Sequence, residues 1–258
     1  SFNLGKFKFL NDDDPINSMN NLRLCRFQGQ SNDSRIGLVT NENFIVDLTV
    51  LGIHRMDTLL ESDDIKERIS KLSDNNLTKI ELKDAKLLVP LEQQEVWAAG
   101  VTYSRSKKAR KIESDFSAVA YDRVYSADRP QIFFKSIPEK VVATDEPIGM
   151  RSDSNWNVPE PELVLVMNSS GKIVGYTIGN DMSSRDIEGE NLLYQPQAKI
   201  YNRSCSIGPW IIIGVNEEEA RKWIISIKIK RNDKLIYQDE ISVSQIKRSF
   251  TELVEYLS

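Results

Sequence analysis

The sequence predicts a predominantly β, α+β fold in which a small N-terminal β-rich domain precedes a larger domain. Short apolar runs separated by turn residues recur along most of the chain, and helical periodicity is confined to a few stretches. The chain has 258 residues, 40% hydrophobic and 28% charged, which is ordinary globular composition for one or two domains. We expect the first domain to span residues 1–90 and the second to span residues 91–258.

The first domain is expected to form a strand meander followed by one helix. From Leu22 to Leu48, short apolar runs alternate with turn residues, a pattern typical of meandering strands. Helical periodicity follows from Met56 to Leu72, and Ala85 to Pro90 resembles a strand that leads into a connection. The only histidine, His54, lies in this region, far from the motif-rich part of the chain, so histidine chemistry such as a Ser-His-Asp triad is not expected.

The second domain is expected to consist mainly of strands. Residues Ser104 to Ala120 have the composition of a charged helix, either a lid or a surface element. Strands are predicted at Ile132–Ser136, Lys140–Ala143, Leu163–Val166, Ile173–Ile178, Trp210–Val215, Ile224–Lys230 and Lys234–Asp239. A short helix should begin after Asn216, and an amphipathic helix is expected from Ser244 to Leu257.

Charge and cysteine content restrict the classes of partner. The formal net charge is -4 and the only basic patch is the local KKARK at residues 107–111, so we expect no nucleic acid partner. We see no signal peptide and no apolar run long enough for a membrane span, so no membrane partner is expected either. Cys25 and Cys205 lie far apart without zinc-type spacing, which favours a reducing, cytoplasmic location.

The stretch NVPEPELVLV, residues 157–166, places two carboxylates at the start of a strand. Glu160 and Glu162 are two residues apart, so in an extended chain both side chains point to the same face. Pro159 and Pro161 lack amide donors, which suits the beginning of a strand. Two neighbouring anions repel unless a cation or a proton intervenes. A metal site and an exposed strand end with two hydrated glutamates both fit this stretch.

A third carboxylate, Asp181, lies in GYTIGNDMSSRDIEGEN, residues 175–191. If the two flanking strands form a hairpin, Asp181 returns beside the two glutamates. Three carboxylates without His or Cys make an all-oxygen site that suits Mg2+, Mn2+ or Ca2+ better than zinc. For Asp186, Glu188 and Glu190, surface solvation or the first turn of a helix is the simpler explanation.

An acidic metal site that binds an anionic substrate also needs basic side chains. Arg185, Lys199 and Lys135 are the nearest candidates in the sequence. The stretch YQPQAKIYNRSCSIGPW, residues 194–210, would place Gln197 and Lys199 on one face of a strand, so that both point into the site. An edge strand with solvated polar residues is the alternative.

Three of these stretches in this order resemble the fumarylacetoacetate hydrolase superfamily. They are PEPEL (159–163), GYTIGNDMSSRD (175–186), and QPQAK to IGPW (195–210), and the resemblance runs from about Val96 to Ile213. It implies a mixed β-sheet roll and a homodimer or homotetramer. Family members usually continue into a Gly- and Thr-rich strand segment beyond the last helix. Because this chain stops at Ser258, begins with Ser and has only 12 glycines, we expect it to lack segments of the natural protein.

The resemblance also implies roles for individual residues. Glu160, Glu162 and Asp181 correspond to the residues that bind Mg2+ or another divalent ion in the family, with Mn2+ and Ca2+ as the alternatives here. The residues expected to face a small 2-oxo acid substrate are Arg185, Lys199, Gln197 and Tyr103. The residues expected to take part in catalysis are Lys199, Arg185, Lys135 and Gln131.

Further phrases resemble one branch of the superfamily, the 2-keto-3-deoxy-D-arabinonate dehydratases. These are VYSADRPQIFFK, RSDSNWNVPEPEL and RDIEGENLLYQPQAKIY. The hydrolases activate water with a His-Glu pair, and this region has no His. The resemblance implies that a metal chelates the C1 carboxylate and C2 carbonyl of a 2-keto-3-deoxy sugar acid and makes a C3 proton acidic. Lys199 and Arg185 would offset the enolate charge while the C4 hydroxyl leaves.

The chain departs from that branch at residue 131, where Gln131 replaces the Glu expected after Arg-Pro. An amide cannot transfer the proton, so the acid-base role would pass to another group such as Glu113, Glu188 or Lys135. Two alternatives therefore stay open: a hydrolase or decarboxylase acting on acylpyruvate-type 2,4-dioxo acids, and a catalytically inactive protein that binds a keto acid.

Overall fold

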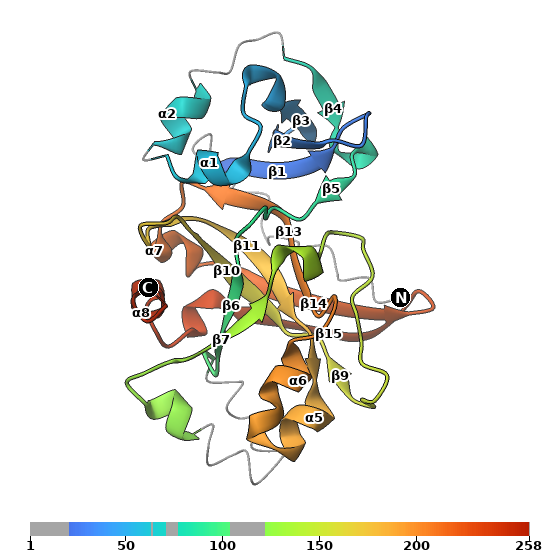
Figure 1. Cartoon of the computed structure of the whole chain (residues 1–258), viewed down its shortest axis with the longest axis vertical. Helices are drawn as coiled ribbons and strands as arrows, with labels where there is room; N and C mark the ends of the chain where they lie inside the picture. The colour runs from blue at the N-terminus through green and yellow to red at the C-terminus, as the bar shows by residue number, and fades with distance from the viewer. Residues whose placement is uncertain (1–20, 63, 71–76, 104–121, 258) are drawn as a thin grey trace.

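The computed structural model describes residues 21–62, 64–70, 77–103 and 122–257 (Figure 1). The strands are β1 (Leu22–Gln28), β2 (Ser34–Val39), β3 (Phe44–Asp47), β4 (Lys79–Glu81), β5 (Leu87–Leu88), β6 (Val96–Gly100), β7 (Gln131–Ser136), β8 (Val141–Val142), β9 (Asn157–Val158), β10 (Pro161–Met167), β11 (Ile173–Asp181), β12 (Ser183–Ser184), β13 (Cys205–Ile213), β14 (Ile224–Arg231) and β15 (Lys234–Ser242). The α-helices are α1 (Met56–Leu60), α2 (Ile65–Ser70), α5 (Arg185–Glu190), α6 (Gln195–Lys199), α7 (Glu217–Ala220) and α8 (Phe250–Glu255).

A nine-stranded sheet joins the N-terminal strands to strands of the second domain. Its order is β10-β11-β13-β1-β2-β3-β4, with β5 paired to β1 and β8 paired to β13. The N-terminal strands lie together with α1 and α2 at one end of the molecule, and β1 joins the other strands by pairing with β13 (Figure 1). This arrangement confirms the predominantly β, α+β fold, while the boundary near residue 90 stays a prediction.

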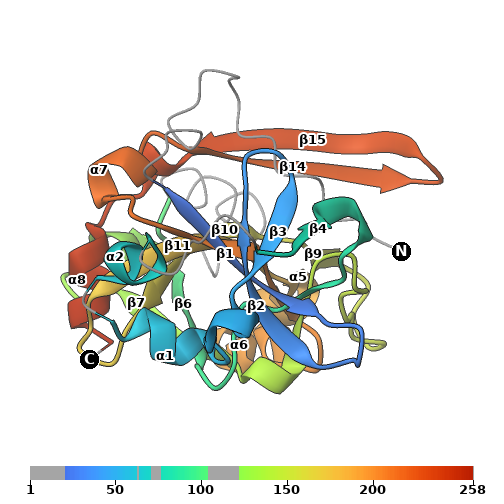
Figure 2. The same ribbon diagram turned by 90° about the horizontal axis from the view of Figure 1, so that it is seen from above.

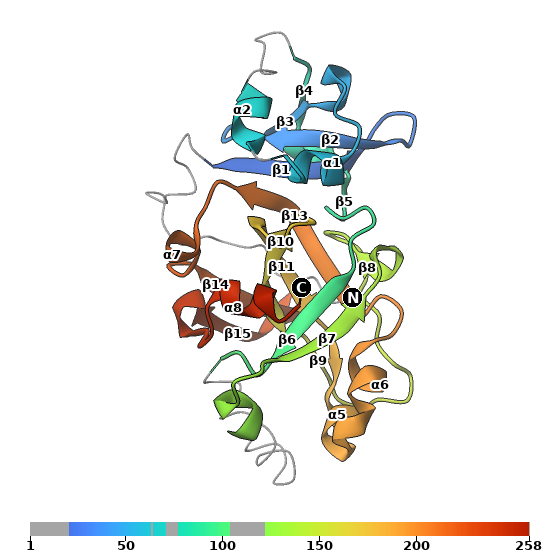
Figure 3. The ribbon, with the colours of Figure 1, turned by 60° about the vertical axis from the view of Figure 1, so that its left-hand side comes forward.

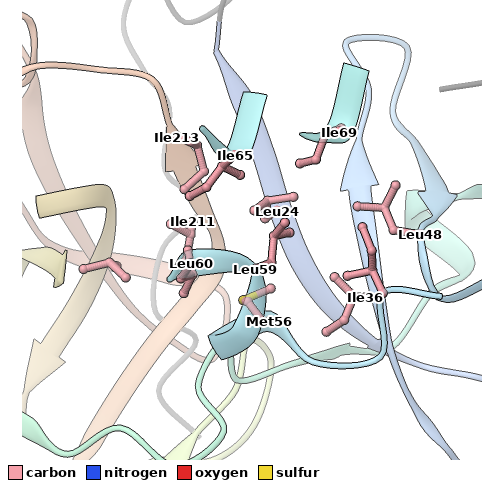
Figure 4. Close-up of a cluster of buried hydrophobic side chains, with 12 residues drawn as sticks. Leu24, Ile36, Leu48, Met56, Leu59, Leu60, Ile65, Ile69, Ile211 and Ile213 are labelled. Carbon is pink, nitrogen blue, oxygen red and sulfur yellow. The ribbon is translucent and has the colours of Figure 1, made fainter. Parts of the chain in front are cut away.

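Strand β1 is covered on both faces. Because side chains alternate along β1, Leu24 packs under α1 and α2 while Cys25 and Phe27 pack on the opposite face. Figure 4 shows Leu24 in the first of these clusters with Met56, Leu59 and other side chains from both helices.

The helix expected from Met56 to Leu72 is two helices, so that prediction was wrong. α1 ends at Leu60, and the Asp64 side chain accepts a hydrogen bond of 2.8 Å from the backbone nitrogen of Glu67 in α2. Asp64 therefore caps a new helix, because its carboxylate satisfies a donor that would otherwise lack a partner in the first turn.

The β10–β11 hairpin positions the acidic residues. The two strands are antiparallel, with Glu162 opposite Gly179, which confirms the hairpin that the sequence suggested. The connecting turn is closed by Asn168, whose side chain accepts from the backbone nitrogens of Ser170 and Lys172, and Gly171 adopts the positive φ of 78° that favours glycine. Strand β13 then pairs with β11, so that Cys205 lies opposite Asp181.

Two helical segments differ from the expectations. The stretch expected to be a strand with Gln197 and Lys199 on one face is helix α6, with Pro196 in its first turn. Residues two apart in a helix point in different directions, so Lys199 is buried while Gln197 is exposed. Instead of one helix from Ser244 to Leu257, there is a 3₁₀ turn at Val243–Gln245 and then α8, which Ser249 caps.

Three further strand pairs in the described residues lie outside the large sheet, and the short β9–β12 pair places Val158 opposite Ser183. β14 and β15 form an antiparallel ribbon that extends beyond the other elements (Figure 2). β6 and β7 form another antiparallel pair, which lies between α8 and the α5–α6 helices (Figure 3). Helix α7 follows Asn216 with a complete capping box, as expected. The helix expected at Ser104–Ala120 lies outside the described residues. Among the described residues, no helix combines the length and the apolar character needed to cross a membrane.

Candidate metal centre

The structure brings three carboxylates together at one end of the β10–β11 hairpin. Glu160 lies just before β10, Glu162 is on β10, and Asp181 is the last residue of β11. The backbone nitrogen of Asp181 donates a hydrogen bond of 2.9 Å to the carbonyl oxygen of Glu160, which fixes the two strand ends together. One oxygen from each carboxylate lies within 4.8 Å of the others. The hairpin register alone therefore produces the acidic cluster.

Two polar neighbours that the sequence did not single out hold this cluster. The side-chain oxygen of Asn180 accepts a hydrogen bond of 2.8 Å from the backbone nitrogen of Glu160. The Ser183 hydroxyl is 3.0 Å from Glu160 Oε2 and 3.0 Å from the carbonyl oxygen of Asp181. The alternation rule could have suggested Ser183, because it lies two residues after Asp181 on the same extended segment.

Lys199 occupies the centre of the cluster. Its Nζ is 2.6 Å from Glu160 Oε2, 2.6 Å from Asp181 Oδ2 and 2.7 Å from Ser183 Oγ. It comes from the last residue of α6, which packs beside α5 below the end of the hairpin. One ammonium group thus bridges two of the three candidate ligands.

Arg185 binds the cluster from the first residue of α5. Its Nη2 is 2.6 Å from Glu160 Oε1, and its Nη1 is 2.5 Å from an oxygen of Glu188. Glu188 is buried and lies one helical turn after Arg185. The structure therefore places Glu188 in the polar network, although a solvated helix start was the simpler sequence interpretation.

Lys135 binds Asp181 from the other side. Its Nζ is 2.6 Å from Asp181 Oδ1 and 3.2 Å from the carbonyl oxygen of Met182, and it also donates to the carbonyl oxygen of Lys199. Lys135 is the extra residue of a β-bulge in β7, because its neighbours Phe134 and Ser136 pair with the consecutive residues Trp97 and Val96. Such a bulge turns the side chain out of the regular alternation and toward the cluster.

Burial and the neighbouring carboxylates shift the pKa of Glu162 in the same direction, but burial and neighbouring charges act in opposite directions on Asp181 and Lys199. Removal from water, followed by the carboxylates of Asp181 and Glu160, raises the pKa of Glu162 to about 8. Burial alone would raise the pKa of Asp181, but the ammonium groups of Lys199 and Lys135 outweigh it and lower that pKa. Burial would lower the pKa of Lys199, yet Asp181 and Glu160 raise it well above its usual value. Asp181 and Lys199 are therefore both ionised.

A cavity of about 460 Å³ opens beside the cluster. Glu162, Asp181 and Lys135 line its polar part, and Tyr103 lies on its wall. Burial and then the nearby Glu162 raise the pKa of the Tyr103 hydroxyl, so this group stays protonated at neutral pH. Apolar side chains from β6, β10 and α8 line the remainder. The cavity can therefore accept a small organic ligand in contact with Glu162 and Asp181.

The other sequence candidates are not all brought to the cluster. Gln131 begins β7 and shares a face with Phe133, whose ring centroid lies 5.8 Å from Lys199 Nζ. The Gln131 side chain packs on Gly100, where an added Cβ would lie 2.5 Å from its Oε1. Gln197 is exposed on α6, away from the buried face that carries Lys199. Glu113 lies outside the described residues.

The donor set suits a hard divalent cation. The cluster offers only carboxylate oxygens, without His or Cys, and this is the chemistry that Mg2+ and Mn2+ prefer. Counting Glu188 and taking Glu162 as ionised, the part of the network within the described residues holds four carboxylates against three cationic side chains. A divalent ion would change its formal charge from -1 to +1, and a monoanion would then neutralise it.

Comparison with known proteins places the chain in a family. Residues 95–258 match the family model described as fumarylacetoacetate (FAA) hydrolase C-terminal. A "Probable 2-keto-3-deoxyxylonate dehydratase" of Haloferax volcanii is 49% identical over 175 residues, which are 68% of this chain and 60% of that protein. A "2-dehydro-3-deoxy-D-arabinonate dehydratase" of Saccharolobus solfataricus is 35% identical over 195 residues, 74% of this chain and 65% of that protein. The chain thus spans about three fifths to two thirds of these relatives.

A solved structure agrees with this assignment. The structure described as "2-keto-3-deoxy-D-arabinonate dehydratase complexed with magnesium and 2,5-dioxopentanoate" superimposes with a TM-score of 0.70 at 29% identity. The superposition covers 92% of this chain and 81% of that one. The resemblance suggested by the three sequence stretches is confirmed: the chain belongs to the fumarylacetoacetate hydrolase family, and its relatives include 2-keto-3-deoxy sugar acid dehydratases.

Proposed function

We propose that the protein is a divalent-metal-dependent carbon-oxygen lyase that removes water from a 2-keto-3-deoxy sugar acid such as 2-keto-3-deoxy-D-arabinonate. The observation that carries this proposal is the cluster of Glu160, Glu162 and Asp181, whose oxygens lie within 4.8 Å of one another beside a cavity. The dehydratase relatives and the magnesium in the related complex support it.

The three carboxylates would hold Mg2+, and Mn2+ or Ca2+ could take its place. When bound, the ion supplies a Lewis acid that polarises the 2-oxo group of the substrate. Lys199 and Arg185 provide positive charge at the same place, since both contact Glu160 at 2.6 Å. We assign them to binding the substrate carboxylate and to stabilising negative charge that develops on the 2-oxo oxygen.

Lys135 and Glu188 receive different roles. The Lys135 ammonium is surrounded by Asp181 and two backbone carbonyls, so we assign it to positioning Asp181 rather than to proton transfer. Glu188 is a buried carboxylate that Arg185 connects to Glu160. Because Gln131 cannot exchange a proton, we assign to Glu188 the removal of the C3 proton and its return to the departing C4 hydroxyl.

The charge balance supports a substrate with a single carboxylate. With all four carboxylates ionised, the described part of the network has a formal charge of -1 and would reach +1 with a divalent ion. A sugar acid monoanion neutralises that charge, whereas a dianion or a phosphorylated acid would leave an excess of negative charge in a buried site.

Incubation with 2-keto-3-deoxypentonates, with Mg2+ or with a chelator, tests the proposal. The expected result is loss of one water from the substrate, seen by mass spectrometry, only when the metal is present. Glu188→Gln should lose turnover but keep metal binding by calorimetry, and Gln131→Glu should retain activity. Bound keto acid recovered unchanged in the presence of bound metal would contradict the proposal and indicate a binding protein.

A second candidate is carbon-carbon cleavage of an acylpyruvate by hydrolysis or decarboxylation. The apolar lining of the cavity favours it, because side chains such as Val164, Ile246 and Leu253 suit an acyl tail better than a sugar hydroxyl. The same incubation with acylpyruvates separates the two candidates, since cleavage yields a shorter acid rather than a dehydrated product.

We further propose a cytoplasmic homodimer or homotetramer. Cys25 and Cys205 are both buried free thiols, which suits a reducing compartment. The β14–β15 ribbon exposes Leu235, Ile236 and Tyr237 at its surface, and apolar side chains gathered there suit contact with a second copy. Light scattering during gel filtration measures the mass, and a monomer at micromolar concentration would contradict the oligomer.

A further inference from the structure

Cationic side chains occupy every oxygen of two candidate ligands. At Glu160, Arg185 contacts Oε1 and Lys199 contacts Oε2; at Asp181, Lys135 contacts Oδ1 and Lys199 contacts Oδ2. All four distances are 2.6 Å. Any further cation that binds these carboxylates must therefore share or displace an existing ionic contact.

Lys199 differs from the other two cations in what holds it. Arg185 is also bound to Glu188, and Lys135 also donates to two backbone carbonyls, so each has an anchor outside the three carboxylates. The polar contacts of Lys199 Nζ go to Glu160, Asp181 and the Ser183 hydroxyl that itself donates to Glu160. Among the residues that the structure describes, the hydrogen-bond and ion-pair partners of the Lys199 ammonium group thus all belong to the cluster or to Ser183, with the Phe133 ring 5.8 Å away as an aromatic neighbour.

A divalent ion and this ammonium group need the same oxygens. Both are attracted to Glu160 and Asp181, and they repel each other across a short distance in a buried site. The ammonium group of Lys199 is at the end of a flexible four-carbon side chain, so it can move while helix α6 stays in place. The anchors of Arg185 and Lys135 make such movement more costly for them.

We propose that Lys199 is an internal counter-ion of the metal centre, which divalent metal displaces from Glu160 and Asp181. The displaced ammonium group then binds the carboxylate of the substrate. The metal therefore binds first and prepares the site for the substrate. Without metal, Lys199 neutralises the half-buried Glu160 and the buried Asp181 and stabilises the fold. This inference rests on the proposed function, because it takes the cluster to be a metal site.

Lys199→Met tests the competition without any measurement of turnover. The matched control is Arg185→Met, which removes the same charge from Glu160 at the same distance of 2.6 Å. Calorimetric titration with Mn2+ should show Lys199→Met binding about tenfold tighter than the natural protein, because no internal cation competes. The affinity of the Arg185→Met control for Mn2+ should increase clearly less. An equal gain in both variants, or weaker binding in Lys199→Met, would overturn the inference.

Thermal unfolding of the same proteins gives a second measurement. Lys199→Met should melt at a lower temperature than the natural protein in the presence of chelator, because buried carboxylates lose their shared counter-ion. Saturating Mn2+ should raise the melting temperature of Lys199→Met by more than it raises the melting temperature of the natural protein. Equal stabilisation of the two proteins by Mn2+ would contradict the role of Lys199 as a counter-ion.

Labelling the natural protein avoids dependence on any variant. Lysine acylation followed by mass spectrometry should show faster modification of Lys199 with saturating Mg2+ than with chelator, while Lys135 changes little and serves as the reference. If the labelling of Lys199 is unchanged with bound Mg2+, this inference is overturned but the proposed function is not. If neither the natural protein nor Lys199→Met binds metal, both this inference and the proposed function are refuted.

Discussion

Replacing Lys135 with methionine should strongly destabilise the protein. The side chain is 2% exposed, and the substitution removes the 2.6 Å ion pair with Asp181 and the hydrogen bond to the Met182 carbonyl while keeping most of the volume. Removing one partner of a buried ion pair costs about 3–5 kcal/mol. Since Lys199 still neutralises Asp181 through Oδ2, we expect the lower end, about 3 kcal/mol. For a chain of this size, that corresponds to a fall of roughly 6–12 °C in the melting temperature.

Urea unfolding followed by tryptophan fluorescence and circular dichroism, with chelator present, measures this loss. Lys228→Met on β14 is the matched control, because its side chain is exposed and its removal should change the free energy of unfolding by less than about 0.5 kcal/mol. The double variant Lys135→Met/Asp181→Asn should lose less than the sum of the single variants, because no uncompensated anion is left. A Lys135→Met variant as stable as the control would refute the buried ion pair as a determinant of stability.

Three further predictions follow from the cluster, the thiols and the core. Glu162→Gln should weaken Mn2+ binding in calorimetry by at least about tenfold while leaving the fold intact by circular dichroism, and unchanged affinity would remove Glu162 from the site. Burial raises the pKa of both Cys25 and Cys205 to about 12, so neither thiol should react with a disulfide reagent at pH 8 until guanidinium is added, and rapid reaction in the native protein would contradict this burial. Phe250→Ala should cost about 3–5 kcal/mol in urea unfolding because the ring is fully buried, whereas Leu193→Ala, at an 83% exposed position, should have little effect, and equal losses would refute Phe250 as a core residue.

The sequence alone determined the predominantly β class and the hairpin that carries the acidic residues. Both depend on local patterns: alternation of apolar side chains, a turn that contains Gly171, and two prolines at the start of a strand. The proximity of Glu160, Glu162 and Asp181 follows from that hairpin register, because consecutive antiparallel strands leave few ways to place their ends.

Local patterns predicted the helices less well. The chain from Met56 to Leu72 has helical periodicity, but the cap at Asp64 divides it, and a side-chain hydrogen bond of that kind competes with continuation of the helix. At Gln195–Lys199, five residues are too few for periodicity to distinguish strand from helix, and the packing of α6 beside α5 decided the outcome.

Only the tertiary structure decided which cations meet the carboxylates and which do not. Lys135 lies 46 positions before Asp181 and reaches it because a bulge in β7 redirects its side chain. Lys199 arrives from the end of a helix, and Gln197 two residues earlier faces solvent. The free energy of these contacts comes from pairing charges that are removed from water together, and no pattern along the chain records which distant segments share that burial. The sequence thus identifies the charged side chains, and the tertiary structure determines which of them form ion pairs.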